Sequence, residues 1–452
     1  MTIDINNFED KKICILGLGY VGLTLAIAMS DVGFEVLGIE INKRILDGLK
    51  KNEAHFYEPG LNQKIENSVR NKSFKFSDNI PKNWDGSVYI ITVGTPLSKD
   101  KTTRLDMIKN ATKQVAIHLK KNDLVIMRST VKLGVTRNVV KEILDKKGIE
   151  YELAFCPERT LEGKALSELR ELPQIIGGLS QKTTIRASQI FYFLTSTVVR
   201  VSDVETAEMI KLIDNAQRDV FFAYSNEVAQ ACNSLGISAA EVIKSGKLGY
   251  KRTNLPLPGP VGGPCLEKDS HILAESLKEK GIVPKITLAA REINENQPEE
   301  TAIYLKNIVS KSKVFKKISK ISLLGIAFKG IPATDDLRGS MAKPIFESLQ
   351  KYFNDAKFYG YDCHVNEQKI SEFGLIPLKD LELAFKESDL VLILNNHPEF
   401  ASMPINNYSI YMNNPSIIYD FWNNHEINNL KLRSGVEYIA LGSHGKSKYK
   451  FI

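Results

Sequence analysis

Near its N-terminus the chain reads Lys12-Ile-Cys-Ile-Leu-Gly-Leu-Gly-Tyr-Val-Gly22, where a short apolar run meets three regularly spaced glycines. The residues that follow, Leu23 to Met29, have apolar side chains at helical spacing. An apolar run, a Gly-x-Gly-x-x-Gly turn and a helical pattern in this order predict a strand, a tight turn and a helix. Because the glycine pattern alone is common, the predicted strand before it and the predicted helix after it are needed to support nucleotide binding.

A second apolar run, Val36 to Ile39, ends in Glu40, 18 residues after the last glycine of the turn. These are the parts of a dinucleotide-binding unit. Gly17 allows the tight turn, Gly19 lets the backbone approach a pyrophosphate, and Gly22 allows the helix to pack closely on the strand. Glu40 would accept hydrogen bonds from the ribose hydroxyls and repel a 2′-phosphate, so the sequence favours NAD over NADP.

Strands and helices alternate in both halves of the chain. Further strands are predicted at residues 88–93, 124–127, 153–156, 321–325, 358–362, 390–394, 417–420 and 438–441, and an unbroken stretch at 204–235 predicts a long helix. Such alternation indicates parallel sheets. The expected fold is α/β, with two doubly wound Rossmann-like domains joined by a long central helix. We expect an NAD-binding domain at 1–202, a central helical region at 203–310, a linker at 310–317 and a C-terminal domain at 318–452.

Composition narrows the class of protein. Lys and Arg number 60 against 53 Asp and Glu, which leaves a net charge of +7 over 452 residues. Without a concentrated basic stripe, this excess favours an enzyme that handles phosphates over a protein that binds nucleic acid. The five cysteines lie far apart without Cys-x-x-Cys spacing, which argues against a disulfide framework and a structural zinc site. No apolar run reaches the roughly 18 residues of a membrane span, so we expect a cytoplasmic protein.

A reactive thiol is predicted at Cys265. The turn-forming run Pro258-Gly-Pro-Val-Gly-Gly-Pro-Cys265 leads into a helical pattern at 270–277. Helix amides and Lys268 both favour the thiolate over the ordinary thiol, whose pKa is about 8.5. If the helix begins at the cysteine, Asp269 lies four residues on and on the same face. The other cysteines, Cys14, Cys156, Cys232 and Cys363, lie in apolar or ordinary settings.

Two other groups of polar residues are candidates for a site. Lys211 and Asn215 are four apart in the long helix, so they project from one face and offer a cation and an amide to a common point. Glu158 and Glu162 follow the strand at 153–156, at the end of a strand where α/β sheets bind ligands. A surface pair and a polar loop are the plain alternatives for these two groups.

Seven motifs, taken in order, resemble those of the UDP-glucose/GDP-mannose dehydrogenase family. They are Gly17-Leu-Gly-Tyr-Val-Gly22, Val93-Gly-Thr-Pro96, Ser129-Thr-Val131, Pro157-Glu-Arg159, Lys211-Leu-Ile-Asp-Asn215, Gly262-Gly-Pro-Cys265 with Lys268-Asp269, and Gly325-Ile-Ala-Phe-Lys329 with Asp336-Leu-Arg338. The resemblance covers nearly the whole chain. It implies an NAD-dependent nucleotide-sugar 6-dehydrogenase that oxidises a primary alcohol to a carboxylate in two steps, with two NAD per sugar.

The resemblance also implies catalytic roles. Cys265 would capture the intermediate aldehyde as a thiohemiacetal, whose oxidation leaves a thioester. A hydride can leave the tetrahedral thiohemiacetal, whereas a free aldehyde could escape. Lys211 and Asn215 would stabilise the oxyanion, and Asp269 would assist proton transfer through water. Glu158, with Thr130 holding a water, would serve thioester hydrolysis.

Binding residues are implied in the same way. The cofactor contacts would be Gly17, Gly19, Tyr20, Val21, Gly22, Glu40, Arg44, Thr95, Thr130, Glu162, Lys268 and Arg338. The substrate contacts would be Arg159, Thr160, Leu161, Lys211, Asn215, Arg252, Gly262, Phe328 and Lys329. In the family, the arginine equivalent to Arg252 crosses from the partner subunit. The resemblance therefore implies a homodimer, built on the long central helix.

The segments at 157–166 and 258–263 look more like the branch that acts on UDP-N-acetylhexosamines than like UDP-glucose dehydrogenases. The implied substrate is UDP-N-acetylmannosamine or UDP-N-acetylglucosamine, and an acidic sugar nucleotide normally feeds polysaccharide biosynthesis. Three residues depart from the pattern: Pro264 replaces a usual His, Gln217 a frequent aromatic, and Trp422 an Arg found in many members.

Other readings of the sequence stay open. UDP-glucose is the alternative substrate. A catalytically silent NAD-binding regulator or scaffold is the alternative from another class, although it would have no use for Cys265, Lys211, Asn215 and Asp269 together. An epimerase or lyase would recycle one NAD and need no cysteine. Net NADH production separates these alternatives.

Overall fold

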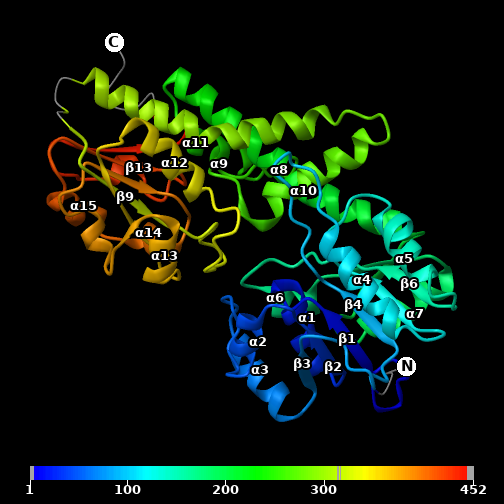
Figure 1. Cartoon of the computed structure of the whole chain (residues 1–452). Helices are drawn as coiled ribbons and strands as arrows, with labels where there is room; N and C mark the ends of the chain where they lie inside the picture. The colour runs from blue at the N-terminus through cyan, green and yellow to red at the C-terminus, as the bar shows by residue number, and fades with distance from the viewer. Residues whose placement is uncertain (1–4, 313–314, 316, 445–452) are drawn as a thin grey trace. The chain divides into compact units, whose positions relative to one another are not determined.

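The computed structural model describes residues 5–312, 315 and 317–444, and these form two compact units (Figure 1). Unit 1 contains the chain up to Asn215 together with His271–Val283, and unit 2 contains Ala216–Ser270 and the chain from Pro284 onward. Helices α8 (Val204–Leu235) and α10 (Gly263–Lys278) each pass from one unit to the other. The long helix expected at 204–235 is thus confirmed. Residues 313, 314 and 316 of the expected linker lie outside the described residues.

Unit 1 contains a sheet in the order β3-β2-β1-β4-β5-β6-β7-β8. Its strands are β1 (Lys12–Leu16), β2 (Glu35–Ile39), β3 (Phe74–Ser77), β4 (Val88–Ile91), β5 (Leu124–Met127), β6 (Glu152–Phe155), β7 (Gln174–Gly178) and β8 (Val198–Arg200). The first six strands are parallel, and β7 runs antiparallel to β6. Strands β3, β7 and β8 add to those expected from the sequence.

Helices cover both faces of this sheet, which explains why its strands read as continuous apolar runs. They are α1 (Tyr20–Asp31), α2 (Lys43–Leu49), α3 (Leu61–Arg70), α4 (Asp106–His118), α5 (Lys141–Asp145), α6 (Ala165–Glu171) and α7 (Gln181–Phe191), with shorter turns of helix at Ile5–Asn7 and Thr136–Val140. Along β1, Ile13 and Ile15 belong to one buried cluster, whereas Cys14 and Leu16 belong to the cluster on the other face.

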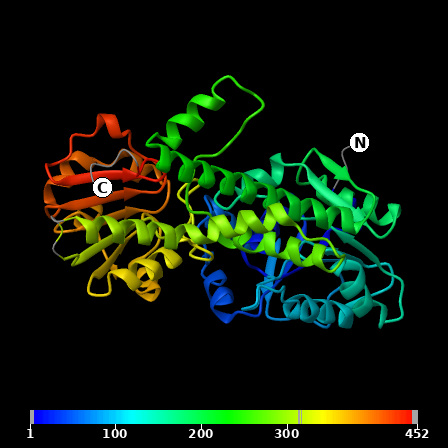
Figure 2. The same cartoon turned by 90° about the horizontal axis from the view of Figure 1, so that it is seen from above.

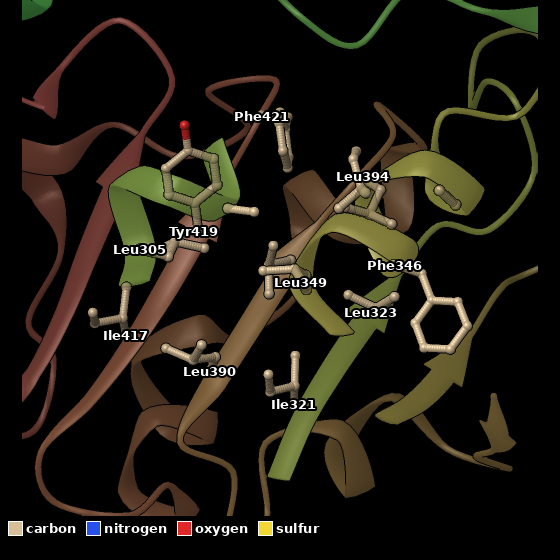
Figure 3. Packing of buried hydrophobic residues seen from close by; sticks show 14 of the residues in the cluster. Leu305, Ile321, Leu323, Phe346, Leu349, Leu390, Leu394, Ile417, Tyr419 and Phe421 are labelled. Carbon is tan, nitrogen blue, oxygen red and sulfur yellow. The ribbon is translucent and has the colours of Figure 1, made fainter. Parts of the chain in front are cut away.

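Unit 2 repeats the same topology in a sheet of order β11-β10-β9-β12-β13-β14, all parallel. Its strands are β9 (Lys320–Leu324), β10 (Lys357–Tyr361), β11 (Ile376–Pro377), β12 (Leu390–Ile393), β13 (Ser416–Asp420) and β14 (Val436–Ala440). The core on one face gathers Ile321, Leu323, Leu349 and Leu390, as Figure 3 shows. The second Rossmann-like domain expected from the sequence is therefore confirmed.

The helices of unit 2 include two that lie alongside each other. They are the C-terminal part of α8 and the 27-residue α11 (Lys285–Lys311), which are joined by hydrogen bonds from Asn226 to Asn294 (3.0 Å) and from Gln297 to Asn226 (2.9 Å) (Figure 2). The remaining helices are α9 (Ala239–Lys247), α12 (Ala342–Tyr352), α13 (Glu367–Phe373), α14 (Pro398–Ser402) and α15 (Ile405–Tyr408), with short turns at Leu381–Ala384, Ser409–Tyr411 and Ile427–Asn429. In the described part of the chain, no helix is both long and apolar enough to span a membrane.

Candidate active site

The glycine turn has the geometry that a dinucleotide requires. Gly17 has φ +94°, and a Cβ on Gly22 would lie 1.8 Å from the Gly17 carbonyl oxygen. Both positions therefore accept only glycine. Gly19 is the N-cap of α1, and a Cβ there would meet nothing within 4 Å. The space above Gly19 is open for a pyrophosphate at the helix N-terminus, beside Tyr20 and Val21.

Glu40 directly follows β2 and its carboxylate braces the turn. Its Oε2 accepts from the Leu18 N–H (2.9 Å) and its Oε1 from the Asn42 N–H (2.9 Å). The acid expected to bind the ribose is thus held at the edge of the glycine turn. Arg44 is exposed in the first turn of α2, where its N–H donates to Asn42.

The loops after β4 and β5 are tied together beside this turn. The Thr95 hydroxyl donates to the Thr130 carbonyl oxygen (2.6 Å), and the Ser129 hydroxyl donates to the Val93 carbonyl oxygen (2.7 Å). A Cβ on Gly17 would approach Val93 to 3.0 Å. The structure therefore brings Thr95 and Thr130, two expected cofactor contacts, to the carboxyl edge of the sheet near the first glycine.

Glu58 links the start of α1 to the loop that contains Glu162. The Tyr20 hydroxyl donates to Glu58 Oε2, and the Gly163 N–H donates to the same oxygen (2.8 Å). Glu58 is buried. The sequence gives no sign of this role, because Glu58 lies in a loop without regular pattern and its partners are 38 and 105 residues away.

Glu158 is held at the carboxyl edge of β6 by Arg128, which follows β5. Both Arg128 Nε (3.1 Å) and Nη2 (2.6 Å) donate to Glu158 Oε2, while Oε1 accepts from the Arg159 and Thr160 amides (2.7 and 2.8 Å). Burial alone would raise the pKa of Glu158, but the charge of Arg128, the Thr160 amide and the charge of Lys211 outweigh it and lower the pKa. Arg128 was not among the expected site residues, although its place after a strand is a usual one for a site residue.

The long helix brings Lys211 and Asn215 into unit 1 as buried side chains. The charge of Lys211 acts on Glu158, so these two expected residues are neighbours. The loop at 159–161 is fixed nearby: Arg159 Nη1 lies 3.2 Å from Asp214 Oδ2, and the Leu161 N–H donates to Glu168 (2.7 Å).

Cys265 lies in the first turn of α10, and it is exposed. Cys14, Cys156 and Cys232 are buried, which raises the pKa of each of these thiols. As the sequence predicts, Cys265 and Asp269 belong to one helix. Asp269 is fully buried and accepts from Lys268 Nζ (2.5 Å).

Lys268 remains a cation beside the thiol. Burial alone would lower its pKa, but the negative charges of Asp269 and Cys265 outweigh this effect and raise the pKa. Arg338 lies near enough for its charge to oppose that rise, and it is itself paired with Asp336 (Nη2 to Oδ2, 2.6 Å).

Close backbone packing in unit 2 fixes the position of the chain segment that precedes Cys265. The Gly263 N–H donates to the Gly339 carbonyl oxygen (2.7 Å), and a Cβ on Gly262 would lie 2.2 Å from that oxygen. A Cβ on Gly263 would lie 2.5 Å from the Phe328 ring. The structure thus brings Phe328, an expected substrate residue, next to the chain segment that contains both Gly262 and Cys265.

Trp422, which departs from the family pattern, supports the same segment. A Cβ on Gly259 would lie 2.9 Å from the Trp422 ring, and Trp422 Nε1 donates to the Leu394 carbonyl oxygen (2.8 Å).

Two other expected substrate residues lie beside aromatic rings. Lys329 Nζ lies 5.2 Å from the Phe328 ring centroid. Arg252 is exposed, with its guanidinium 5.2 Å from the Tyr250 ring centroid.

Comparison with known proteins identifies the family of this chain. Three models of one family match in order: the NAD-binding domain at residues 11–195, the central domain at 205–296 and the UDP-binding domain at 322–426. The chain belongs to the UDP-glucose/GDP-mannose dehydrogenase family. It is therefore an NAD-dependent nucleotide-sugar dehydrogenase with a UDP-sugar substrate, and the glycine turn of unit 1 belongs to its NAD-binding domain.

Relatives within this family are similar over nearly their whole length. The chain is 33% identical to the UDP-N-acetyl-D-mannosamine dehydrogenase of Campylobacter jejuni, with 88% of this chain and 98% of that protein covered. It is 31% identical to a Methanococcus maripaludis protein of the same name, with 88% of each covered. The solved UDP-D-ManNAc dehydrogenase of Pyrococcus horikoshii has a TM-score of 0.86 at 28% identity, with 96% of this chain and 100% of that chain covered.

Proposed function

We propose that this dehydrogenase oxidises the 6-hydroxyl of a UDP-N-acetylhexosamine to the uronic acid through a covalent intermediate on Cys265. The names of the relatives from Campylobacter jejuni and Methanococcus maripaludis favour UDP-N-acetylmannosamine over UDP-N-acetylglucosamine as the substrate. A cytoplasmic location and a homodimer, in which Arg252 would serve the partner's substrate, are further parts of this proposal.

The exposure of Cys265 carries the mechanistic part of the proposal. This thiol is accessible in the first turn of a helix with Lys268 beside it, whereas Cys14, Cys156 and Cys232 are buried. A cation and the first turn of a helix both favour the nucleophilic thiolate. A regulator without chemistry would have no need for this combination.

The residues of unit 1 fit NAD. Gly17, Gly19 and Gly22 shape the turn, and Glu40, which accepts from the Leu18 N–H beside it, would also accept hydrogen bonds from the ribose hydroxyls. When bound, NAD supplies the hydride acceptor for each of the two oxidations. The proposed contacts with the nicotinamide half are Thr95, Thr130 and Glu162, and Lys268 and Arg338 are the remaining proposed cofactor residues.

The chain's own groups would then carry the substrate chemistry. The Cys265 thiolate adds to C6 of the aldehyde and forms a C–S bond, while Lys211 and Asn215 hold the oxygen that becomes an oxyanion. After the second oxidation leaves a thioester, water adds to the same carbon, the C–S bond breaks, and the thiolate is restored. Asp269 would assist the proton transfers through water.

The hydrogen bonds that Glu158 already accepts limit how it could act in the hydrolysis. A carboxylate has about four lone-pair positions, and in this structure Glu158 already accepts four hydrogen bonds from Arg128, Arg159 and Thr160. It can act on a water held by Thr130 only by releasing one of these donors. Its lowered pKa keeps it ionised for that role.

Kinetics with three nucleotide sugars test the proposal. At fixed NAD, we expect two NADH per sugar consumed and a kcat/KM for a UDP-N-acetylhexosamine at least about tenfold above that for UDP-glucose, because a pocket for an acetamido group leaves polar partners unpaired when a hydroxyl replaces it. Equal turnover of UDP-glucose would refute the sugar assignment. One NADH with free aldehyde would refute the covalent route, and no net NADH would refute oxidation.

A further inference from the structure

Cys363, His397 and Glu399 converge in unit 2, although none of them has a role in the proposed reaction. One ligand atom from each, the thiol Sγ, an imidazole nitrogen and a carboxylate oxygen, lies within 4.8 Å of the other two, and Sγ is 3.1 Å from Nδ1. Ligands of a tetrahedral zinc ion, with bonds of about 2.0–2.3 Å, are about 3.3–3.8 Å apart. All three side chains are partly exposed, so an ion can reach them.

The three residues come from two segments that follow strands at the carboxyl edge of the second sheet, and Glu399 lies in the first turn of α14. Cys363 follows β10, and His397 and Glu399 follow β12; the sheet order places these two strands on either side of β9. In a doubly wound sheet, ligands bind at this edge. A cation held there would tie the two segments together across the end of β9.

The backbone around these residues is fixed before any ion binds. Asp362 Oδ1 accepts from the amides of His364 (2.8 Å) and Val365 (3.1 Å), which shapes the turn after Cys363. The His397 N–H donates to Asn395 Oδ1 (3.1 Å). A Cβ on Gly330 would lie 2.0 Å from the backbone nitrogen of His397. Only glycine at position 330 therefore allows the segment that contains His397 to pass so closely.

The ligand atoms are also oriented. The Glu399 N–H donates to His397 Nδ1 (3.3 Å), so the lone pair of the neutral imidazole is on Nδ1. An ion bound through Nδ1 would take this lone pair and displace the Glu399 N–H. The Tyr361 hydroxyl donates to Glu399 Oε1 (2.8 Å). Such outer hydrogen bonds hold the ligands of metal sites in place.

We propose that Cys363, His397 and Glu399 bind one divalent cation of the zinc type, with a water in the fourth position. Thiolate and imidazole ligands select zinc-like ions over Mg²⁺ and Ca²⁺, which prefer oxygen ligands. On binding, the Cys363 thiol releases its proton to solvent and forms a metal–sulfur bond, with no change of oxidation state. The residues are 34 and 2 positions apart in sequence, a spacing that matches no zinc motif.

Cobalt(II) is the probe for this site, because a cobalt–thiolate bond gives a charge-transfer band in the near ultraviolet. The protein is the full chain without an affinity tag, with Cys265→Ala to remove the exposed thiol. We expect a band that saturates at one Co²⁺ per chain and disappears when Zn²⁺ is added. Zn²⁺ should also raise the melting temperature of this protein.

Matched variants locate the ligand. In the same background, Cys363→Ser should abolish the band and the thermal shift, whereas Cys232→Ser, which alters a buried cysteine of the same unit, should keep both. Tyr361→Phe leaves all three ligands in place and should weaken Co²⁺ binding by about tenfold or more, since it removes only the outer hydrogen bond. Circular dichroism establishes that each variant is folded.

Three results would overturn the proposal. They are the absence of a thiolate band at stoichiometric Co²⁺, a band that survives Cys363→Ser, and unchanged affinity in both Tyr361→Phe and Glu399→Gln. If Cys363→Ser does not fold, the affinities of Tyr361→Phe and Glu399→Gln decide the question. Binding of Mg²⁺ or Ca²⁺ with equal affinity would contradict the assigned type of cation.

Discussion

Arg128 and Glu158 form a buried ion pair across the carboxyl ends of β5 and β6, with Nη2 of the guanidinium 2.6 Å from Oε2 of the carboxylate. The pair also positions the loop at 159–161, because the other carboxylate oxygen accepts from the amides of Arg159 and Thr160. Arg128 further donates to the Cys156 carbonyl oxygen and to Gln174. A single arginine therefore holds the loop at 159–161 in place through Glu158.

Arg128→Met should destabilise the protein by about 3–5 kcal/mol, because it leaves Glu158 as a buried charge without a partner. The measurement is the free energy of unfolding in urea. Arg104→Met is the control, since Arg104 forms an exposed pair with Asp106 and its loss should leave the unfolding midpoint unchanged. Equal stability of the two variants would contradict the role given to Arg128.

The same pair should make stability depend on pH in acid. The pKa of Glu158 in the folded protein lies below its ordinary value of about 4.3. The ionised carboxylate therefore stabilises the fold above about pH 4.3, and this contribution is lost as the pH falls through the lowered pKa. The free-energy difference between the parent and Arg128→Met/Glu158→Leu should be constant from pH 7 to 5 and change below pH 4. A difference that already changes near pH 6 would refute the assignment.

Gly19→Ala should weaken NAD binding without loss of stability. The new Cβ meets nothing within 4 Å in the protein, but it would occupy the space proposed for the pyrophosphate beside the backbone. We expect the Kd for NAD to rise about tenfold or more and the melting temperature to stay within a degree or two. Gly246→Ala, also with open space around its Cβ but in α9, should leave NAD affinity unchanged. Titration calorimetry measures both.

Glu40→Ala should weaken NAD binding by about 1.5–3 kcal/mol, the size of hydrogen bonds to a charged group, and should reduce discrimination against NADP. The loss of negative charge removes the repulsion of the 2′-phosphate. Glu35→Ala, at the exposed start of the same strand, is the control. If NAD affinity is the same in Glu40→Ala and Glu35→Ala, Glu40 does not contact the ribose.

Cys265→Ala should abolish acid formation and leave NAD binding near normal, because the glycine turn is in another unit. Cys232→Ala, at a buried position, should retain activity. Iodoacetamide should modify Cys265 faster than the buried thiols, and bound substrate should slow the reaction. Acid formation by Cys265→Ala above a few per cent of the parent rate would show that another group is the nucleophile.

Local sequence determined the glycine turn, both sheets and α8. The apolar runs of β1 and β5 were recognisable because a strand buried on both faces needs apolar side chains at every position, which neighbouring residues alone reveal. Helix α11 lies almost wholly in the expected central helical region, but the sequence did not single it out as one helix, because Pro298 interrupts its pattern. The contacts of Asn294 and Gln297 with α8 support this helix. The edge strands β3 and β11 were also not predicted, because they are only four and two residues long, too short for a pattern to stand out.

The sequence predicted several residues of the candidate site, but not the residues that hold them in position. The glycines and Cys265 could be named because each belongs to a motif of a few adjacent residues, and Glu40 because it ends the next apolar run, 18 residues after Gly22. Glu58, Arg128 and the meeting of Cys363 with His397 depend on contacts between residues 28 to 105 positions apart. The tertiary structure alone determines which distant polar groups are buried next to each other. A buried charge is stable only beside a partner of opposite charge or a hydrogen-bonding group, and packing determines which residue that partner is.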